Sequence, residues 1–104
     1  MPPKSERLSK NDFSLLSRRN MIRTPLFDIG YLVSEKNKVA CIISKKTLKR
    51  AVDRNKAKRK MYNVFKECKP IKPYTILIYP KREVLYTSQT ELKNKMSEIF
   101  ATLQ

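Results

Sequence analysis

The chain has 104 residues, of which 24 are Lys or Arg, 9 are Asp or Glu and none is His, so its formal net charge is +15. This length predicts one domain, and the charge favours a nucleic-acid partner over an anionic membrane surface. No apolar run approaches the roughly 20 residues of a membrane span, and no signal peptide is visible, so a cytoplasmic protein is expected.

The first predicted elements are a tail and a short helix. Residues 1–7 are rich in proline and charge, and we interpret them as a flexible tail ahead of one domain over residues 8–104. Residues 9–12 read Ser-Lys-Asn-Asp, which resembles a capping box with Asp in the Glu position. This pattern predicts a short helix that ends at about Arg18.

Two strands are predicted next. Aromatic and aliphatic side chains alternate over Leu26–Val33, which is typical of a strand with one buried face. Val39–Ser44 is apolar on both faces, and this pattern predicts a central strand. Cys41 in that run and Cys68 further on are interpreted as core residues rather than a disulfide, metal ligands or nucleophiles.

A basic segment follows over residues 44–60, where nine of the seventeen side chains are Lys or Arg. Leu48 and Val52 do not share a face with the apolar residues that come later. Those residues recur at helical spacing and consist of Ala57, Met61, Val64, Phe65 and Cys68. The pattern predicts a connector over about residues 45–50 and a helix from about Ala51 to Cys68.

The opposite side of this helix offers an amide, cations and a ring. Its residues are Asn55, Lys58, Arg59 and Tyr62, with Arg54 and Lys56 beside them and Lys45 and Lys46 in the connector. An amide can bond phosphate or a base edge, a guanidinium suits phosphate, and a tyrosine ring can stack on a base. A solubilising surface is the alternative, but the scarcity of acidic neighbours favours an anionic partner.

The remaining sequence predicts a strand and a helix. Pro70 and Pro73 end the basic helix, and Tyr74–Tyr79 is an apolar strand. Residues 88–91 read Ser-Gln-Thr-Glu, a capping box. The helix that it opens turns one apolar face to the core, made of Leu92, Met96, Ile99, Phe100 and Leu103. This order of elements predicts an α+β fold with helices packed on one side of a sheet.

The run from Lys49 to Arg59 resembles the signature of the protein subunit of bacterial ribonuclease P. That signature reads Ala-Val, any residue, Arg-Asn-Arg, two residues and Lys-Arg. The flanks at 44–46 and 64–67 also match, and a weaker resemblance extends from about Arg7 to Phe100. Two positions depart from the family, since Lys56 and Tyr62 each stand where it usually has Arg.

The resemblance implies a fold, a function and a second binding surface. The fold would be a four-stranded mixed sheet with three helices and a left-handed crossover around the basic helix. The chain would bind a catalytic RNA subunit and the 5′ leader of precursor tRNA and so promote removal of that leader. Catalysis and most of the magnesium binding would belong to the RNA, with no catalytic residue or metal ligand in this chain. Phe13, Phe27 and Tyr31 would line a cleft for the leader.

Two other classes of function remain open. A structural RNA-binding protein, such as a small ribosomal protein, would share the charge and the topology but would not explain the Arg-Asn-Lys-x-Lys-Arg spacing. A self-sufficient nuclease would need an acid–base or metal centre, and the sequence offers no convincing one. Neither a membrane nor a small-molecule substrate is expected as a partner.

Overall fold

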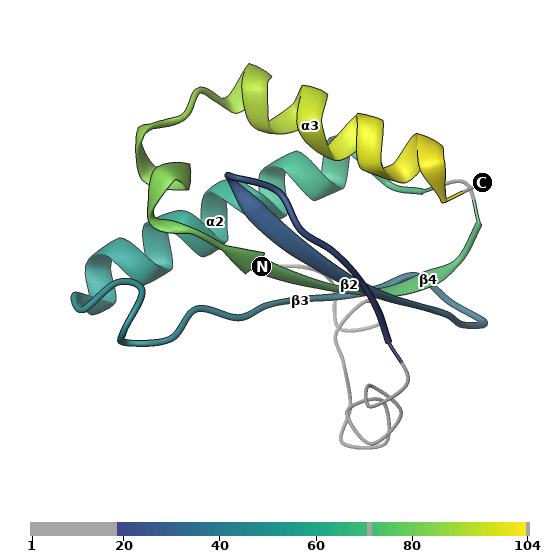
Figure 1. Ribbon diagram of the computed structural model, residues 1–104, viewed down its shortest axis with the longest axis horizontal. Coiled ribbons are helices and arrows are strands. Elements are labelled where there is room, and N and C mark those ends of the chain that lie inside the picture. The colour runs from purple at the N-terminus through teal and green to yellow at the C-terminus, as the bar shows by residue number, and fades with distance from the viewer. Residues whose placement is uncertain (1–18, 71, 104) are drawn as a thin grey trace.

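The computed structural model describes residues 19–70 and 72–103 (Figure 1). Its elements are β1 (Asn20–Ile22), β2 (Phe27–Val33), β3 (Lys38–Cys41), α2 (Ala51–Cys68), β4 (Tyr74–Pro80), the 3-10 helix η3 (Arg82–Tyr86) and α3 (Gln89–Thr102). The strands form one sheet in the order β1-β2-β4-β3, with β4 antiparallel to β2 and parallel to β3. Helices α2 and α3 pack against each other on one face of the sheet (Figure 1). The predicted α+β fold is therefore confirmed, while the predicted tail and first helix lie outside the described residues.

The core lies between this face of the sheet and the two helices. The predicted stripe of α2 is confirmed, because Ala57, Met61, Val64 and Phe65 are all buried. From α3 the rings and aliphatic chains of Leu92, Met96, Ile99 and Phe100 complete the core. The rings of Phe65 and Phe100 meet edge to face with centroids 6.0 Å apart, which fixes the packing of the helices on each other.

The last helix begins where its capping box predicts. Ser88 precedes α3 in an extended conformation, and its side chain accepts a hydrogen bond from the main-chain N–H of Glu91 at 3.2 Å. This bond satisfies a donor that the first turn of a helix otherwise leaves without a partner. No helix of the described part is both long enough and apolar enough to cross a membrane.

The structure differs from the predicted elements in three places, at β3, β1 and η3. β3 is an edge strand rather than a central one, and β4 is the strand buried on both faces. The apolar character of β3 has a different cause, since α2 covers one of its faces. β1 was not predicted from the pattern, because three residues of which two are exposed carry no alternation. η3 was not predicted either, and it is held by the fully buried side chain of Val84.

Candidate RNA interface

The basic segment folds into a tight turn followed by a helix, as predicted. In the turn, the main-chain N–H of Leu48 donates to the Ser44 carbonyl at 3.2 Å, and the Leu48 side chain is only 7% exposed. The buried leucine therefore anchors a connector whose basic side chains remain in solvent. These exposed cations are Lys45, Lys46, Lys49 and Arg50.

The outward face of α2 differs in part from the predicted one. Asn55, Lys56 and Arg59 are exposed, as expected. Two further exposed side chains, Asn63 and Lys66, lie on the same side and were missed. Helical spacing explains their position, because residues 52, 55, 56, 59, 63 and 66 fall on one face at about 100° per residue. This exposed set, together with the four connector cations, is called the basic face below.

Lys58 and Tyr62 lie on the flank of α2 rather than on its outward face, and both are half-buried. The Tyr62 hydroxyl oxygen accepts a hydrogen bond from the main-chain N–H of Cys41 at 3.1 Å, and the ring packs against the core. The expectation that Tyr62 points away from the core and offers a free ring for stacking is therefore wrong. Lys58 is near enough to Cys41 to oppose, in part, the burial that raises the pKa of that thiol to about 12.

Two cations of the segment donate to the main chain of the protein itself. The Lys60 ammonium donates to the Val84 carbonyl at 2.9 Å and so ties η3 to α2. Arg54 donates through Nη1 to the carbonyls of Leu48 and Lys49, both at 2.8 Å. Arg54 and Lys60 therefore support the architecture around the basic face. The structure keeps Arg54 within reach of a partner because its side chain is only half-buried.

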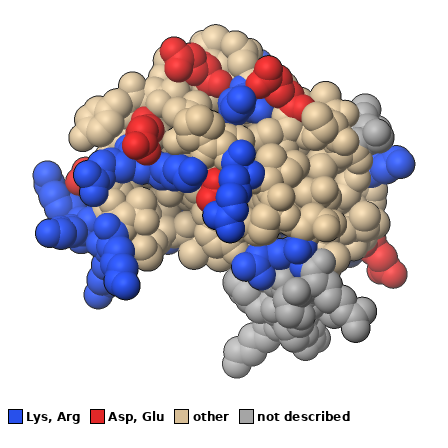
Figure 2. Space-filling view, viewed as in Figure 1, with Lys and Arg blue, Asp and Glu red and all other residues tan. Residues whose placement is uncertain are grey.

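Charge is distributed unevenly over the molecular surface. In Figure 2 the Lys and Arg side chains gather at the end of the molecule where α2 begins, and Asp and Glu side chains are prominent over α3. On α3 a lysine lies beside an acid, as in the Lys95–Glu98 ion pair at 3.5 Å. The basic face therefore has a local excess of positive charge that α3 does not share, and such an excess attracts a polyanion.

The predicted leader cleft is not formed as expected. Phe27 is 0% exposed and Tyr31 packs edge to face on Tyr74, with ring centroids 5.9 Å apart. Both belong to the sheet face that α2 and α3 cover, and both contact the core. The assignment of Phe27 to an RNA-contacting surface is therefore wrong, and Tyr31 is a packing residue at the rim of the core. Phe13 lies outside the described residues.

The other face of the sheet is the one that α2 and α3 leave uncovered. Across it, the strand register places Met21, Gly30, Leu77 and Ala40 side by side. Gly30 has a steric role here, because a Cβ at this position would lie 3.0 Å from Cδ of Arg19 and 3.1 Å from Sδ of Met21. On the same face, Tyr79 pairs with Asp28 and is half-buried. The pattern of the sequence did not reveal which of the two faces the helices cover.

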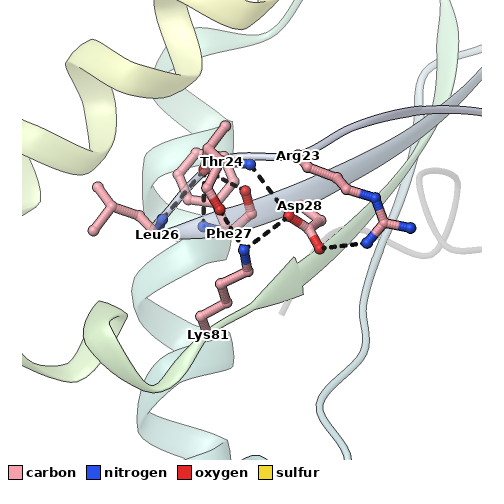
Figure 3. A network of polar contacts seen from close by, with 6 residues as sticks. All are labelled: Arg23, Thr24, Leu26, Phe27, Asp28 and Lys81. Carbon is pink, nitrogen blue, oxygen red and sulfur yellow. Dashed lines mark hydrogen bonds and ion pairs between the residues drawn. The ribbon is translucent and has the colours of Figure 1, made fainter.

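A polar network fixes one end of this second face (Figure 3). Asp28 is 14% exposed and pairs with Lys81 at 3.3 Å and with Arg23 at 3.7 Å. The Lys81 ammonium also donates to the Thr24 carbonyl at 2.5 Å, and the Thr24 hydroxyl oxygen accepts from the Phe27 N–H at 3.0 Å. The network joins the β1–β2 turn to the residue that follows β4, so it holds two cations at the end of the sheet.

Among residues 19–70 and 72–103, no group of three or more His, Cys, Asp or Glu side chains is placed to hold a metal ion. The described residues present amide and cationic groups on a rigid helix, next to an exposed basic connector, in a chain of net charge +15. A compact α+β domain with this surface belongs to the class of basic nucleic-acid-binding proteins.

Comparison with known proteins identifies the family. The family described as Ribonuclease P matches residues 1–104, and the chain therefore belongs to it. It is a protein subunit of ribonuclease P, which acts in tRNA processing. No curated protein matches the chain.

Solved structures have the same fold. The Thermotoga maritima ribonuclease P protein has a TM-score of 0.81 at 19% identity, covering 95% of this chain and 98% of that one. The Staphylococcus aureus protein has a TM-score of 0.77 at 20% identity, with 97% of each chain covered. A Staphylococcus aureus mutant with defective mRNA degradation activity has a TM-score of 0.79 at 21% identity, covering 96% of this chain and 89% of that one.

Proposed function

We propose that the basic face binds the RNA subunit of ribonuclease P. The observation that carries this proposal is the exposure of Asn55, Lys56 and Arg59 on one side of a helix whose other side is core. The connector adds exposed cations at the beginning of the same helix, Lys45 and Lys46 among them. A cation held on a helix loses less conformational freedom on binding than a cation on a flexible tail.

In this proposal the RNA carries out the cleavage and, with the substrate, holds the magnesium ions. The part of the protein is electrostatic and positional. Phosphates crowd together when an RNA folds, and Lys and Arg side chains that neutralise them release counterions and so favour the assembled state. Arg59 can donate to phosphate through a planar fork, whereas Lys56 acts as a point charge.

We also propose that the leader of precursor tRNA lies on the second face of the sheet. This face carries the ring of Tyr79 and the 38% exposed side chain of Ile42, and cations adjoin it at Arg23 and Lys81. An aromatic ring beside apolar surface, with cations at its end, suits an unpaired strand that stacks its bases and exposes its phosphates. Phe13 remains a proposed contact from the segment before residue 19.

We propose three finer features, the first and third from the sequence and the second from the family. They are a helix over about residues 9–18, a left-handed connection from β3 through α2 to β4, and a cytoplasmic location. The parallel pairing of β3 with β4 requires a crossover of either hand, and α2 provides it.

Reconstitution tests the proposed function. The purified chain is combined with a transcribed bacterial ribonuclease P RNA and a 5′-labelled precursor tRNA, at a magnesium concentration too low for that RNA to act well alone. Cleavage at the leader junction should accelerate when the chain is added. The chain alone should leave the precursor intact, and it should bind precursor more tightly than mature tRNA.

A structural RNA-binding protein would show equal affinity for precursor and mature tRNA and no acceleration, and this result would contradict the proposal. Magnesium-dependent cleavage by the chain alone, after nuclease-free purification, would instead place the active centre in the protein.

A further inference from the structure

Arg54 has an unusual position among the cations of the basic segment. One nitrogen of its guanidinium, Nη1, donates to two successive carbonyls, those of Leu48 and Lys49, and both bonds are 2.8 Å long. Its main-chain N–H bonds to the Arg50 carbonyl at 3.1 Å. Arg54 thus reaches back from the first turn of α2 to the last residues of the connector.

These bonds fix the main chain from which the connector cations project. Upstream, the N–H groups of Thr47 and Leu48 bond to the Ser44 carbonyl at 3.1 and 3.2 Å. Downstream, the guanidinium of Arg54 holds the carbonyls of the two residues before Arg50. The connector is therefore secured on both sides, while its four basic side chains remain exposed.

The position of the Arg54 charge near the N-terminus of α2 is electrostatically unfavourable by itself. The N-terminus of a helix carries a partial positive charge, and a cation there is unfavourable. Arg50, the residue before α2, makes no side-chain cap, and Asp53 is the acidic residue of the first turn. Arg54 adds its charge beside Asp53, at a terminus that also adjoins the four exposed cations of the connector. Two carbonyl dipoles compensate for the charge only while the connector keeps its conformation, so Arg54 couples that conformation to the helix.

We propose that Arg54 is a positioning residue for RNA binding, which acts by holding the connector so that Lys45, Lys46, Lys49 and Arg50 project in fixed directions. This inference rests on the proposed function, since it concerns the same RNA partner. The basic segment then contains two kinds of cation. Some, such as Arg59, contact the RNA directly, and Arg54 holds the connector main chain from which the other cations project. Ordering before binding reduces the entropy lost on binding.

The first test needs no RNA. Hydrogen exchange of the Thr47 and Leu48 amides is measured in the free wild-type protein, in Arg54→Ala and in the matched variant Arg59→Ala. Exchange should become at least about threefold faster in Arg54→Ala and stay unchanged in Arg59→Ala, because only the first variant releases the connector. Unchanged exchange in both variants would overturn the proposal.

The second test is a double-mutant cycle with a transcribed bacterial ribonuclease P RNA. We compare the factor by which Lys49→Ala weakens RNA binding in two backgrounds. This factor should be at least about three times smaller in the Arg54→Ala background than in the wild-type background. The loss caused by Arg59→Ala should be the same in both, since Arg59 lies more than a turn along the helix. Additive losses for Lys49 and Arg54 would overturn the proposal and make Arg54 a direct phosphate contact.

The conservative variant distinguishes charge from geometry. Arg54→Lys keeps the charge but has a shorter side chain and no planar fork. It should bind the RNA almost as weakly as Arg54→Ala, and affinity close to wild type would overturn the proposal. Absence of RNA binding by the wild-type protein would count against the proposed function instead, and the exchange experiment would still decide the role of Arg54 in the connector.

Discussion

The hydroxyl oxygen of Tyr62 on α2 accepts a hydrogen bond from the main-chain N–H of Cys41 on β3, at 3.1 Å. β3 is the outer strand of the sheet, and the next N–H along it, that of Ile42, donates to the Ile78 carbonyl of β4. Alternate N–H groups of a parallel strand point to opposite sides, so the Cys41 N–H points away from β4. Tyr62 thus satisfies a donor at the sheet edge that no strand pairs with in the described structure.

Tyr62→Phe should destabilise the protein by about 1–2 kcal/mol, because it keeps the ring but leaves the Cys41 N–H without its partner. Affinity for the RNA subunit should change little, since the ring packs against the core. The measurements are denaturant unfolding and RNA titration. Tyr86→Phe is the matched control, because that side chain is 84% exposed and its loss of a hydroxyl should change stability by less than about 0.5 kcal/mol. Unchanged stability with weakened RNA binding in Tyr62→Phe would mean that the hydroxyl contacts the RNA and not the Cys41 N–H.

Phe65→Ala should lower the free energy of unfolding by about 3–5 kcal/mol, since it removes a buried ring that packs on Phe100. Val52→Ala on the same helix is the control, because Val52 is 65% exposed and its truncation should change stability by less than about 0.5 kcal/mol. Thermal melts of both variants are compared with wild type. Similar melting temperatures for the two variants would mean that the buried and exposed faces of α2 are the reverse of those described.

The helices could be predicted because they depend on local chemistry. The apolar stripe of α2 has helical spacing and the Ser88 capping box is adjacent to α3, so both elements begin where the sequence indicates. The side-chain environment at the flank of α2 could not be predicted in the same way. Tyr62 falls about 60° from Arg59 on a helical wheel, and only the tertiary structure places the end of β3 beneath it.

The sheet face that the helices cover could not be predicted from the sequence pattern either. Alternation places Phe27 and Tyr31 on one face of β2 and Gly30 on the other, but the central strand β4 is buried on both of its faces. The hydrophobic pattern therefore does not show which face the helices cover. The family resemblance suggested that the aromatic face met RNA, whereas the packing of α2 and α3 places that face in the core.

Cys41 should make stability fall with increasing pH in alkaline solution. Burial raises the pKa of its thiol from 9.0 to about 12, with Lys58 partly opposing this rise. The unfolded chain therefore loses this proton before the folded one, so the contribution is complete below pH 9 and is lost as pH rises toward 12. The slope should approach about 1.4 kcal/mol per pH unit above pH 9.

The measurement for this prediction is the free energy of unfolding between pH 8 and about pH 11, in wild type and in Cys41→Ala. Other groups titrate in this range in both proteins, so the difference between them isolates the thiol. The variant should lose stability less steeply than wild type. Parallel curves would show that the thiol ionises equally easily in both states.

Tyr79→Ala should weaken binding of precursor tRNA by about 1–3 kcal/mol if the ring stacks on a leader base, and should leave affinity for mature tRNA unchanged. Tyr31→Ala is the control, because Tyr31 lies on the opposite, helix-covered face. It should not change the ratio of the two affinities. A selective loss in Tyr31→Ala but not in Tyr79→Ala would place the leader on the other side of the sheet.

The binding of the RNA subunit to two matched charge reversals tests the role of the basic face most directly. Arg59→Glu alters the exposed side of α2, and Lys95→Glu alters a lysine of α3 that pairs with Glu98 at 3.5 Å. Both change the net charge equally, and both affinities are measured over a range of salt concentrations. Arg59→Glu should weaken binding by at least about tenfold at low salt and reduce the slope of log affinity against log salt, while Lys95→Glu should have little effect. Equal losses in the two variants would contradict a specific interface and leave only diffuse attraction between a basic protein and RNA.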